Sequence, residues 1–190
     1  GGADCPSAGF TDVNTSAWYH EALDYVITRG LMSGYGNSKF GPNDTLSRGM
    51  VVTILHRLEG YPPSKEHSAV LDVPSNQYYA DAVAWAAENG IVGGYGNGMF
   101  GPNDDITREQ LAAILYRYAQ YKGMTAVSLE ENLIGFSDHE KISGYAVQAM
   151  NWAIGQKLIN GVGDNILDPQ GNATRAQAAM ILMRFCENKK

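Results

Sequence analysis

The chain has 190 residues, of which 44% are hydrophobic and 18% are charged, as in a globular protein and not in a disordered one. Its formal net charge of −6 argues against a nucleic-acid partner, because duplex binding depends on clustered Lys and Arg. No apolar run approaches the roughly 18 residues that span a bilayer, and no signal peptide is recognisable, so we expect no membrane insertion.

A threefold internal repeat organises the whole sequence. Each repeat opens near an aspartate and ends in a Ser-Arg or Thr-Arg pair followed by an apolar stretch. The aspartates are Asp12, Asp72 and Asp138, and the arginines are Arg48, Arg108 and Arg175. A unit of about 60 residues buries too little surface to be stable alone. We therefore expect repeats over residues 1–60, 61–122 and 123–190 that together form one domain.

The first helix of each repeat is indicated by apolar residues at helical spacing. In the first repeat they are Trp18, Ala22, Tyr25 and Val26, at positions i, i+4, i+7 and i+8. Tyr78 and Tyr145 begin the matching stripes in the other repeats, while Trp85 and Trp152 occupy mid-helix positions that are predicted to be core. The leading aromatics Trp18, Tyr78 and Tyr145 have two open interpretations, as core residues or as the lining of a ligand site.

The second helix of each repeat is predicted to begin after Ser47, Thr107 or Thr174, since Ser and Thr are good N-caps. Thr107 with Gln110, and Thr174 with Gln177, form capping boxes. A loop of some fifteen residues, rich in Gly, Pro and Asn, separates the two helices. The prediction is an all-α, pseudo-threefold trimer of helix–long loop–helix repeats that forms one compact domain.

The repeated arginines suggest an anion site. Each lies at the first position of a helix, where unpaired backbone N–H groups and the helix dipole favour negative charge, and a guanidinium adds a planar fork of donors. The alternative is that each arginine pairs with a repeated aspartate and only joins the units. A second set of arginines follows nine residues later, at Arg57, Arg117 and Arg184. Because nine residues place them on the opposite side of the helix, they are interpreted as structural clamps that do not share the ligand.

The two cysteines, Cys5 and Cys186, lie near the ends of the chain. If the units close around a pseudo-threefold axis, these residues can meet in a disulfide, which would contribute about 5 kcal/mol in the chain-entropy model and would indicate an oxidising, extracellular setting. The alternative is two unrelated thiols.

These motifs resemble the S-layer homology family over nearly the whole chain. The resemblance rests on the Phe-x-Asp-Val opening, Gly-Tyr-Gly, Phe-x-Pro-Asn-Asp and Thr-Arg-Glu-Gln. It implies a helical trimer on the bacterial cell surface, a monomeric module of a larger protein, that binds a secondary cell-wall polysaccharide, often pyruvylated, in grooves between repeats. The residues to which it assigns the ligand are Arg48, Arg108, Arg175, Asp12, Asp72, Asp138, Trp18, Tyr78 and Tyr145.

Departures from the family pattern predict unequal grooves. Gly49 stands in the first turn of a helix, where it would let a ligand approach the backbone, and the third repeat has Val162 in place of the Gly-Tyr-Gly tyrosine and His139 in place of valine.

Other classes of function have less support in the sequence. The acidic residues mostly recur with the repeat, whereas an active site usually breaks symmetry, so we expect no enzyme. The histidines, His20, His56, His67 and His139, show no metal-binding spacing, and we expect neither metal nor cofactor. The alternative to wall binding is a protein-interaction or self-assembly module of a surface protein.

Overall fold

Each repeat contributes two α-helices, joined by a long loop. The structure, a computed structural model, describes residues 5–65, 70–124 and 132–188. Its helices are α1 (His20–Thr28), α2 (Arg48–Leu58), α3 (Ala80–Glu88), α4 (Arg108–Tyr121), α5 (Val147–Gly155) and α6 (Arg175–Glu187), with short 3-10 helices η1 (Pro6–Gly9), η2 (His139–Lys141) and η3 (Gly144–Ala146). The described part of the chain has no extended strand, only isolated bridges, which confirms the all-α prediction.

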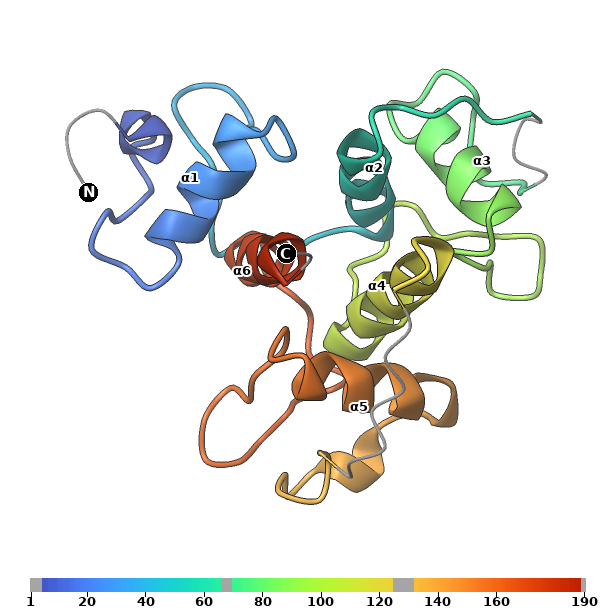
Figure 1. Cartoon of the computed structure of the whole chain (residues 1–190). Helices are drawn as coiled ribbons and strands as arrows, with labels where there is room; N and C mark the ends of the chain where they lie inside the picture. Colours follow the sequence, from blue (N-terminus) through green and yellow to red (C-terminus); the bar gives the residue numbers. More distant parts are fainter. Residues whose placement is uncertain (1–4, 66–69, 125–131, 189–190) are drawn as a thin grey trace.

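The repeats exchange helices around a pseudo-threefold axis. Helix α3 packs against α2, α5 packs against α4, and α1 packs against α6. Figure 1 shows the three resulting lobes, with α2, α4 and α6 nearest the centre and α1, α3 and α5 outside them. Each lobe therefore combines the second helix of one repeat with the first helix of the next, and the α1–α6 pair closes the ring.

A closed set of backbone hydrogen bonds joins the repeats at the axis. Leu46 N–H donates to the Ala173 carbonyl at 3.0 Å, Ala173 N–H donates to Ile106 at 2.9 Å, and Ile106 N–H donates to Leu46 at 2.8 Å. All three side chains are fully buried. Because every repeat both gives and receives one bond, none can leave the ring without breaking two.

The core follows the predicted helical stripes except at their first positions. Trp85 and Trp152 are buried, as predicted. Trp18, Tyr78 and Tyr145 are 60%, 61% and 55% exposed, so their interpretation as core residues is wrong. The helices begin only at His20, Ala80 and Val147. The leading aromatics therefore precede the helices, and helical periodicity does not govern where their side chains point.

The predicted helix starts are confirmed. Ser47, Thr107 and Thr174 each cap their helix with a side-chain oxygen, and both capping boxes are present. No helix in the described ranges is long and apolar enough to cross a membrane.

The disulfide expectation is not supported, because Cys5 and Cys186 are both free cysteines in the structure. Helix α1 lies against α6, so the two ends of the chain do approach the same helix. There the thiols have different neighbours. Cys5 Sγ lies 3.1 Å from His20 Nε2, and Cys186 lies near Tyr25.

Candidate ligand-binding grooves

An aspartate and an arginine hold each inter-helix loop at the same residue. In the second repeat, Asp72 Oδ1 and Oδ2 accept hydrogen bonds from Phe100 N–H and Gly101 N–H, both at 2.7 Å. Arg48 Nε, from the preceding repeat, donates to the Phe100 carbonyl at 2.9 Å. The other repeats show the same arrangement, with Asp12 and Arg175 on Phe40, and Asp138 and Arg108 on Leu167.

The loop amides keep the three aspartates ionised. Partial burial alone raises the pKa of each carboxyl, but two N–H donors from the loop outweigh it, and the pKa of Asp12, Asp72 and Asp138 lies below its usual value. These carboxylates point at the backbone of their own loops, and they are not among the residues that line the grooves described below.

The repeated arginines are buried inter-repeat clamps. Arg48, Arg108 and Arg175 are only 5–6% exposed. Besides the Nε bond, each donates from Nη2 to a second loop carbonyl, at Gly93, Asn160 or Ser33, over 3.2, 2.7 and 2.6 Å. Loop carbonyls therefore accept these hydrogen bonds. The alternative of direct Arg–Asp pairs is replaced by longer-range attraction between the two groups.

The helix N-termini are occupied by protein groups. Arg48 N–H donates to the Asp104 carbonyl and Gly49 N–H to the Pro102 carbonyl, while Met50 N–H is capped by Ser47. Equivalent bonds cover the starts of α4 and α6. The expectation of unpaired N–H groups that bind an anion is thus wrong, because the loop of the next repeat already supplies the acceptors.

Three equivalent grooves lie between the repeats. Each is lined by one buried arginine, the adjacent loop, the second helix that follows that loop, and one of the exposed aromatics. We name them after these aromatics. The Trp18 groove (Arg108, residues 158–162 and α6), the Tyr78 groove (Arg175, residues 31–35 and α2) and the Tyr145 groove (Arg48, residues 92–95 and α4) have volumes of about 350, 240 and 270 Å³.

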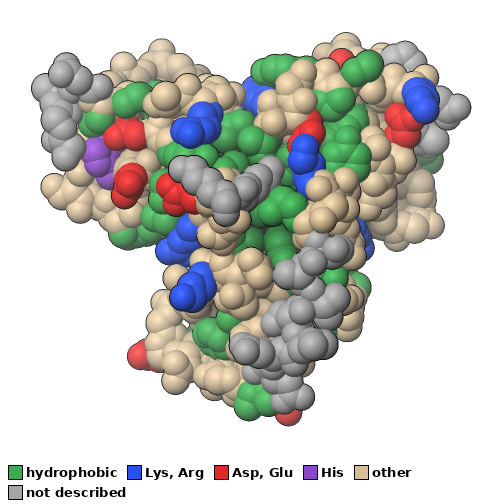
Figure 2. Space-filling view, viewed as in Figure 1, with side chains coloured by type: hydrophobic (Ala, Val, Ile, Leu, Met, Phe, Trp, Pro, Cys, Tyr) green, Lys and Arg blue, Asp and Glu red, His purple; other side chains and the backbone are tan. Residues whose placement is uncertain are grey.

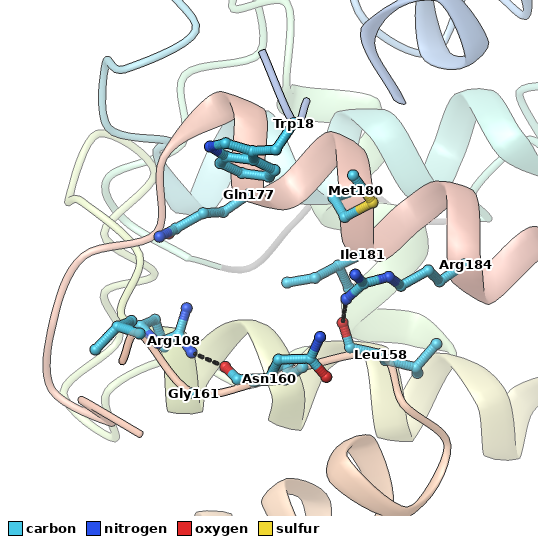
Figure 3. Close-up of a pocket in the computed structure, with 11 residues that line it drawn as sticks. Trp18, Arg108, Leu158, Asn160, Gly161, Gln177, Met180, Ile181 and Arg184 are labelled. Carbon is cyan, nitrogen blue, oxygen red and sulfur yellow. Dashed lines mark hydrogen bonds between the residues drawn. The ribbon is translucent and has the colours of Figure 1, made fainter. Parts of the chain in front are cut away.

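A second arginine lines every groove, which sequence reasoning missed. Arg184 lines the Trp18 groove, Arg57 the Tyr78 groove and Arg117 the Tyr145 groove. Figure 3 shows Arg108 and Arg184 entering the same groove from different helices, with Trp18 at its edge. The two arginines of one helix do face opposite ways, as expected, but each groove receives one arginine from each of two helices.

The predicted clamp role is present in two members of this second set, since Arg57 donates to the Leu31 carbonyl at 3.1 Å and Arg184 to the Leu158 carbonyl at 3.3 Å. Figure 2 shows Lys and Arg side chains around the middle of one face, near the junction of the lobes.

The Trp18 groove lacks an aromatic ring found in the other two. The guanidinium of Arg175 lies 4.5 Å from the Tyr35 ring centroid, and that of Arg48 lies 4.8 Å from the Tyr95 ring. Val162 takes this position in the third repeat. The Tyr95 ring packs where a side chain at Gly101 would stand, within 2.5 Å of an ideal Cβ.

In the third repeat that glycine is replaced by Asp168, so a ring at position 162 would meet the Cβ of this side chain. A tyrosine at position 162 and a side chain at position 168 therefore exclude each other, so the two changes belong together.

A buried carboxylate lies behind the Tyr145 groove, where it contacts the aromatic residue without lining the groove itself. Glu109, 2% exposed, accepts hydrogen bonds from Ser143 N–H at 2.9 Å, Gln170 Nε2 at 2.8 Å and Tyr145 Oη at 3.2 Å. Burial and then the Glu109 charge raise the pKa of Tyr145 to about 12. This groove therefore has negative charge beside its aromatic residue.

Gly49 and Glu109 occupy equivalent positions in α2 and α4. Their neighbours explain why the first repeat has a glycine there and the second a glutamate. An ideal Cβ at Gly49 would stand 2.8 Å from the Pro102 carbonyl and 3.1 Å from the Tyr79 ring. In the third repeat, Ala146 replaces that tyrosine and leaves room for the Glu109 side chain. The expectation that Gly49 admits a ligand is wrong, since the protein itself fills the space.

Chemically, each groove offers guanidinium donors and an exposed aromatic face. This combination suits a small anion attached to a body with an apolar face, such as a sugar. The aromatics Trp18, Tyr78 and Tyr145 and the arginines Arg108, Arg175 and Arg48 are thus brought together, each pair from two different repeats.

Comparison with known proteins identifies the repeats. The family model of the S-layer homology domain matches residues 9–49, 71–112 and 135–179. The chain is 32% identical over 180 residues, 94% of its length, to an amylopullulanase of Thermoanaerobacterium thermosulfurigenes, of which it spans 9%.

Over 96% of its length the chain is 28% identical to the surface-layer 125 kDa protein of Lysinibacillus sphaericus, and over 92% it is 26% identical to the S-layer protein sap of Bacillus anthracis. It spans 15% and 21% of these two relatives. The three matched segments cover most of the chain, which therefore belongs to the S-layer homology family and has its place at the cell surface, in association with the cell wall.

Proposed function

We propose that this chain is a non-catalytic module that anchors a larger protein to the bacterial cell wall by binding an anionic, pyruvylated secondary wall polysaccharide in its grooves. The relatives carry different names, among them an amylopullulanase and surface-layer proteins, and share only this region with the chain. A region common to proteins of such different kinds fits attachment better than catalysis.

The observation that carries the proposal is the pairing of two arginines with one exposed aromatic in every groove. Nε and one Nη2 donor of each buried arginine are used by loop carbonyls, and a guanidinium has five N–H donors in total. The remaining donors, together with the second arginine, suit the carboxylate of a pyruvate ketal. The ring of Trp18, Tyr78 or Tyr145 then packs against the C–H face of the sugar.

The aspartates serve this site indirectly. Asp12, Asp72 and Asp138 bind the loop that carries the arginine-bound carbonyls. We assign them a positioning role, in which they set the shape of the groove wall without contacting the ligand.

The grooves are expected to bind unequally, and the Tyr78 groove most tightly. It has two arginines and a ring over Arg175. The Tyr145 groove has the Glu109 carboxylate beside its aromatic, which repels an anion. The Trp18 groove lacks the ring over its arginine, and Asp168 attracts Arg108 instead.

Cosedimentation with purified wall sacculi, before and after acid removal of the secondary polymer, tests the proposal. Trp18→Ala, Tyr78→Ala and Tyr145→Ala probe the grooves without disturbing the core, because these side chains are more than half exposed. Tyr61→Ala, at an aromatic that is 64% exposed and lies outside the grooves, is the matched control.

We expect binding to disappear on stripping and to weaken in the groove variants but not in the control. Binding that survives stripping and all three substitutions would contradict the proposal and favour a protein partner.

A further inference from the structure

Three side chains of metal-binding types converge at the start of α1. Cys5 Sγ lies 3.1 Å from His20 Nε2, and the same nitrogen lies 3.3 Å from Asp24 Oδ2. The three ligand atoms all lie within 4.8 Å of one another. Sequence spacing predicted no such site, because Cys5 is brought to α1 by the short helix η1 and not by a local motif.

The arrangement does not suit nucleophilic catalysis. In a Cys–His–Asp triad the nucleophile and the carboxylate contact opposite nitrogens of the imidazole, so that one orients the ring while the other gives up its proton. Here both Cys5 and Asp24 approach Nε2. Three ligand atoms that face one point are what a bound cation requires.

We propose that Cys5, His20 and Asp24 form a zinc site, with water as the fourth ligand. Zn–S bonds of about 2.3 Å and Zn–N bonds of about 2.0–2.1 Å put tetrahedral ligand atoms roughly 3.3–3.6 Å apart. The Cys5–His20 and His20–Asp24 separations, 3.1 and 3.3 Å, are close to this range. A thiolate, an imidazole and a carboxylate are ligands that zinc accepts together.

The surroundings support this site. Ser7 N–H donates to Asp24 Oδ1 at 2.8 Å, which fixes the carboxylate and leaves Oδ2 for the metal. The Ser7 hydroxyl is buried without a hydrogen-bond partner among the described residues, so a polar group is left over beside the ligands. Cys5 and Asp24 are only half-buried, and an ion can therefore enter from solvent.

The zinc ion fastens the N-terminal segment to the helix that closes the ring. Cys5 precedes η1, whereas His20 and Asp24 lie one turn apart on α1, which packs against α6. None of the three ligands lines a groove, so this inference does not depend on the proposed function.

Titration of the reduced whole chain with Co²⁺, a spectroscopic substitute for zinc, tests the site. We expect one ion per chain, a thiolate-to-cobalt charge-transfer band and the strong visible absorption of a tetrahedral ion. Cys5→Ser should abolish the charge-transfer band, whereas Cys186→Ser, the matched control at the other cysteine, should retain it. Asp24→Asn should weaken Zn²⁺ affinity by at least about tenfold, and Zn²⁺ should raise the melting temperature of the wild type and of Cys186→Ser but not that of Cys5→Ser.

The proposal is overturned if the reduced wild type shows no thiolate band, or if the band survives Cys5→Ser and disappears in Cys186→Ser. A Cys5–Cys186 disulfide in the protein isolated without reductant would overturn it as well. Circular dichroism of each variant confirms that a lost band reflects a lost ligand and not an unfolded chain.

Discussion

Asp72 and Arg48, which belong to different repeats, hold the same residue from its two sides. Asp72 accepts the N–H of Phe100, and Arg48 donates to the carbonyl of Phe100. The same relationship joins Asp12 to Arg175 and Asp138 to Arg108. Because one partner comes from the loop's own repeat and the other from the preceding repeat, the shape of each groove depends on the docking of two repeats.

Arg48→Ala should destabilise the whole domain by about 2–4 kcal/mol. The substitution removes two bonds from a buried guanidinium and leaves the Phe100 and Gly93 carbonyls without their donor. Urea unfolding followed by circular dichroism measures the loss.

Lys65→Ala, at an exposed cation, is the control for loss of charge and should change stability by less than about 0.5 kcal/mol. Equal stability of the wild type and Arg48→Ala would mean that the clamp is not structural, and that wall-binding losses in this variant report the ligand alone.

The stability of the domain should fall steeply in acid. The pKa of Asp12, Asp72 and Asp138 is below the usual value in the folded state, so their contribution is complete above about pH 4 and is lost as the pH falls through the folded-state pKa. Equilibrium unfolding measured from neutral pH downward should show this loss.

Asp72→Asn isolates one of the three groups. An amide oxygen accepts one loop N–H while the NH₂ group opposes the other, so the variant should be about 1–3 kcal/mol less stable at neutral pH. The gap to the wild type should narrow in acid. A gap that stays constant with pH would show that Asp72 is not ionised in the folded state.

Deletion of residues 123–190 should abolish cooperative folding of the remaining repeats. Helix α1 loses α6, the Phe40 loop loses Arg175, and Leu46 loses its bond to Ala173. Thermal unfolding should show no sharp transition, and coexpression of the missing segment should restore one. A stable, cooperatively folding fragment of residues 1–122 would contradict the ring closure.

The sequence was sufficient to predict what depends on local pattern. Caps at Ser47, Thr107 and Thr174 and the buried Trp85 follow from spacing along one helix. The repeat itself predicted the pseudo-threefold trimer. These features need no knowledge of which helix packs against which.

What sequence reasoning missed depends on the exchange of helices between repeats. Arg48 and Arg57 do face opposite ways, but Arg57 shares its groove with Arg175, which is more than a hundred residues away. Likewise the acceptors at the start of α2 come from the next repeat. Local spacing cannot indicate a partner that only the closed ring brings near.

The third repeat has Val162 and Asp168 where the second has Tyr95 and Gly101. Both residues can be changed back, and the effect of Val162→Tyr should depend on whether Asp168 is still present. Val162→Tyr alone should not stabilise the protein, because the ring meets the Cβ of Asp168 where the second repeat has Gly101. Asp168→Gly opens that space and also removes a non-glycine residue from a positive φ of 51°. Together the substitutions should place a ring over Arg108, worth about 0.5–1 kcal/mol.

A double-mutant cycle by urea unfolding measures this coupling, which should be favourable and about 0.5–3 kcal/mol. The reverse substitution Tyr95→Val, which uncovers Arg48, is the matched control and should cost a similar amount. Additive effects in the cycle would show that Asp168 does not occupy the space of the ring. If the coupling is present and the double variant also binds wall sacculi more tightly than the wild type, the missing tyrosine is what limits the Trp18 groove.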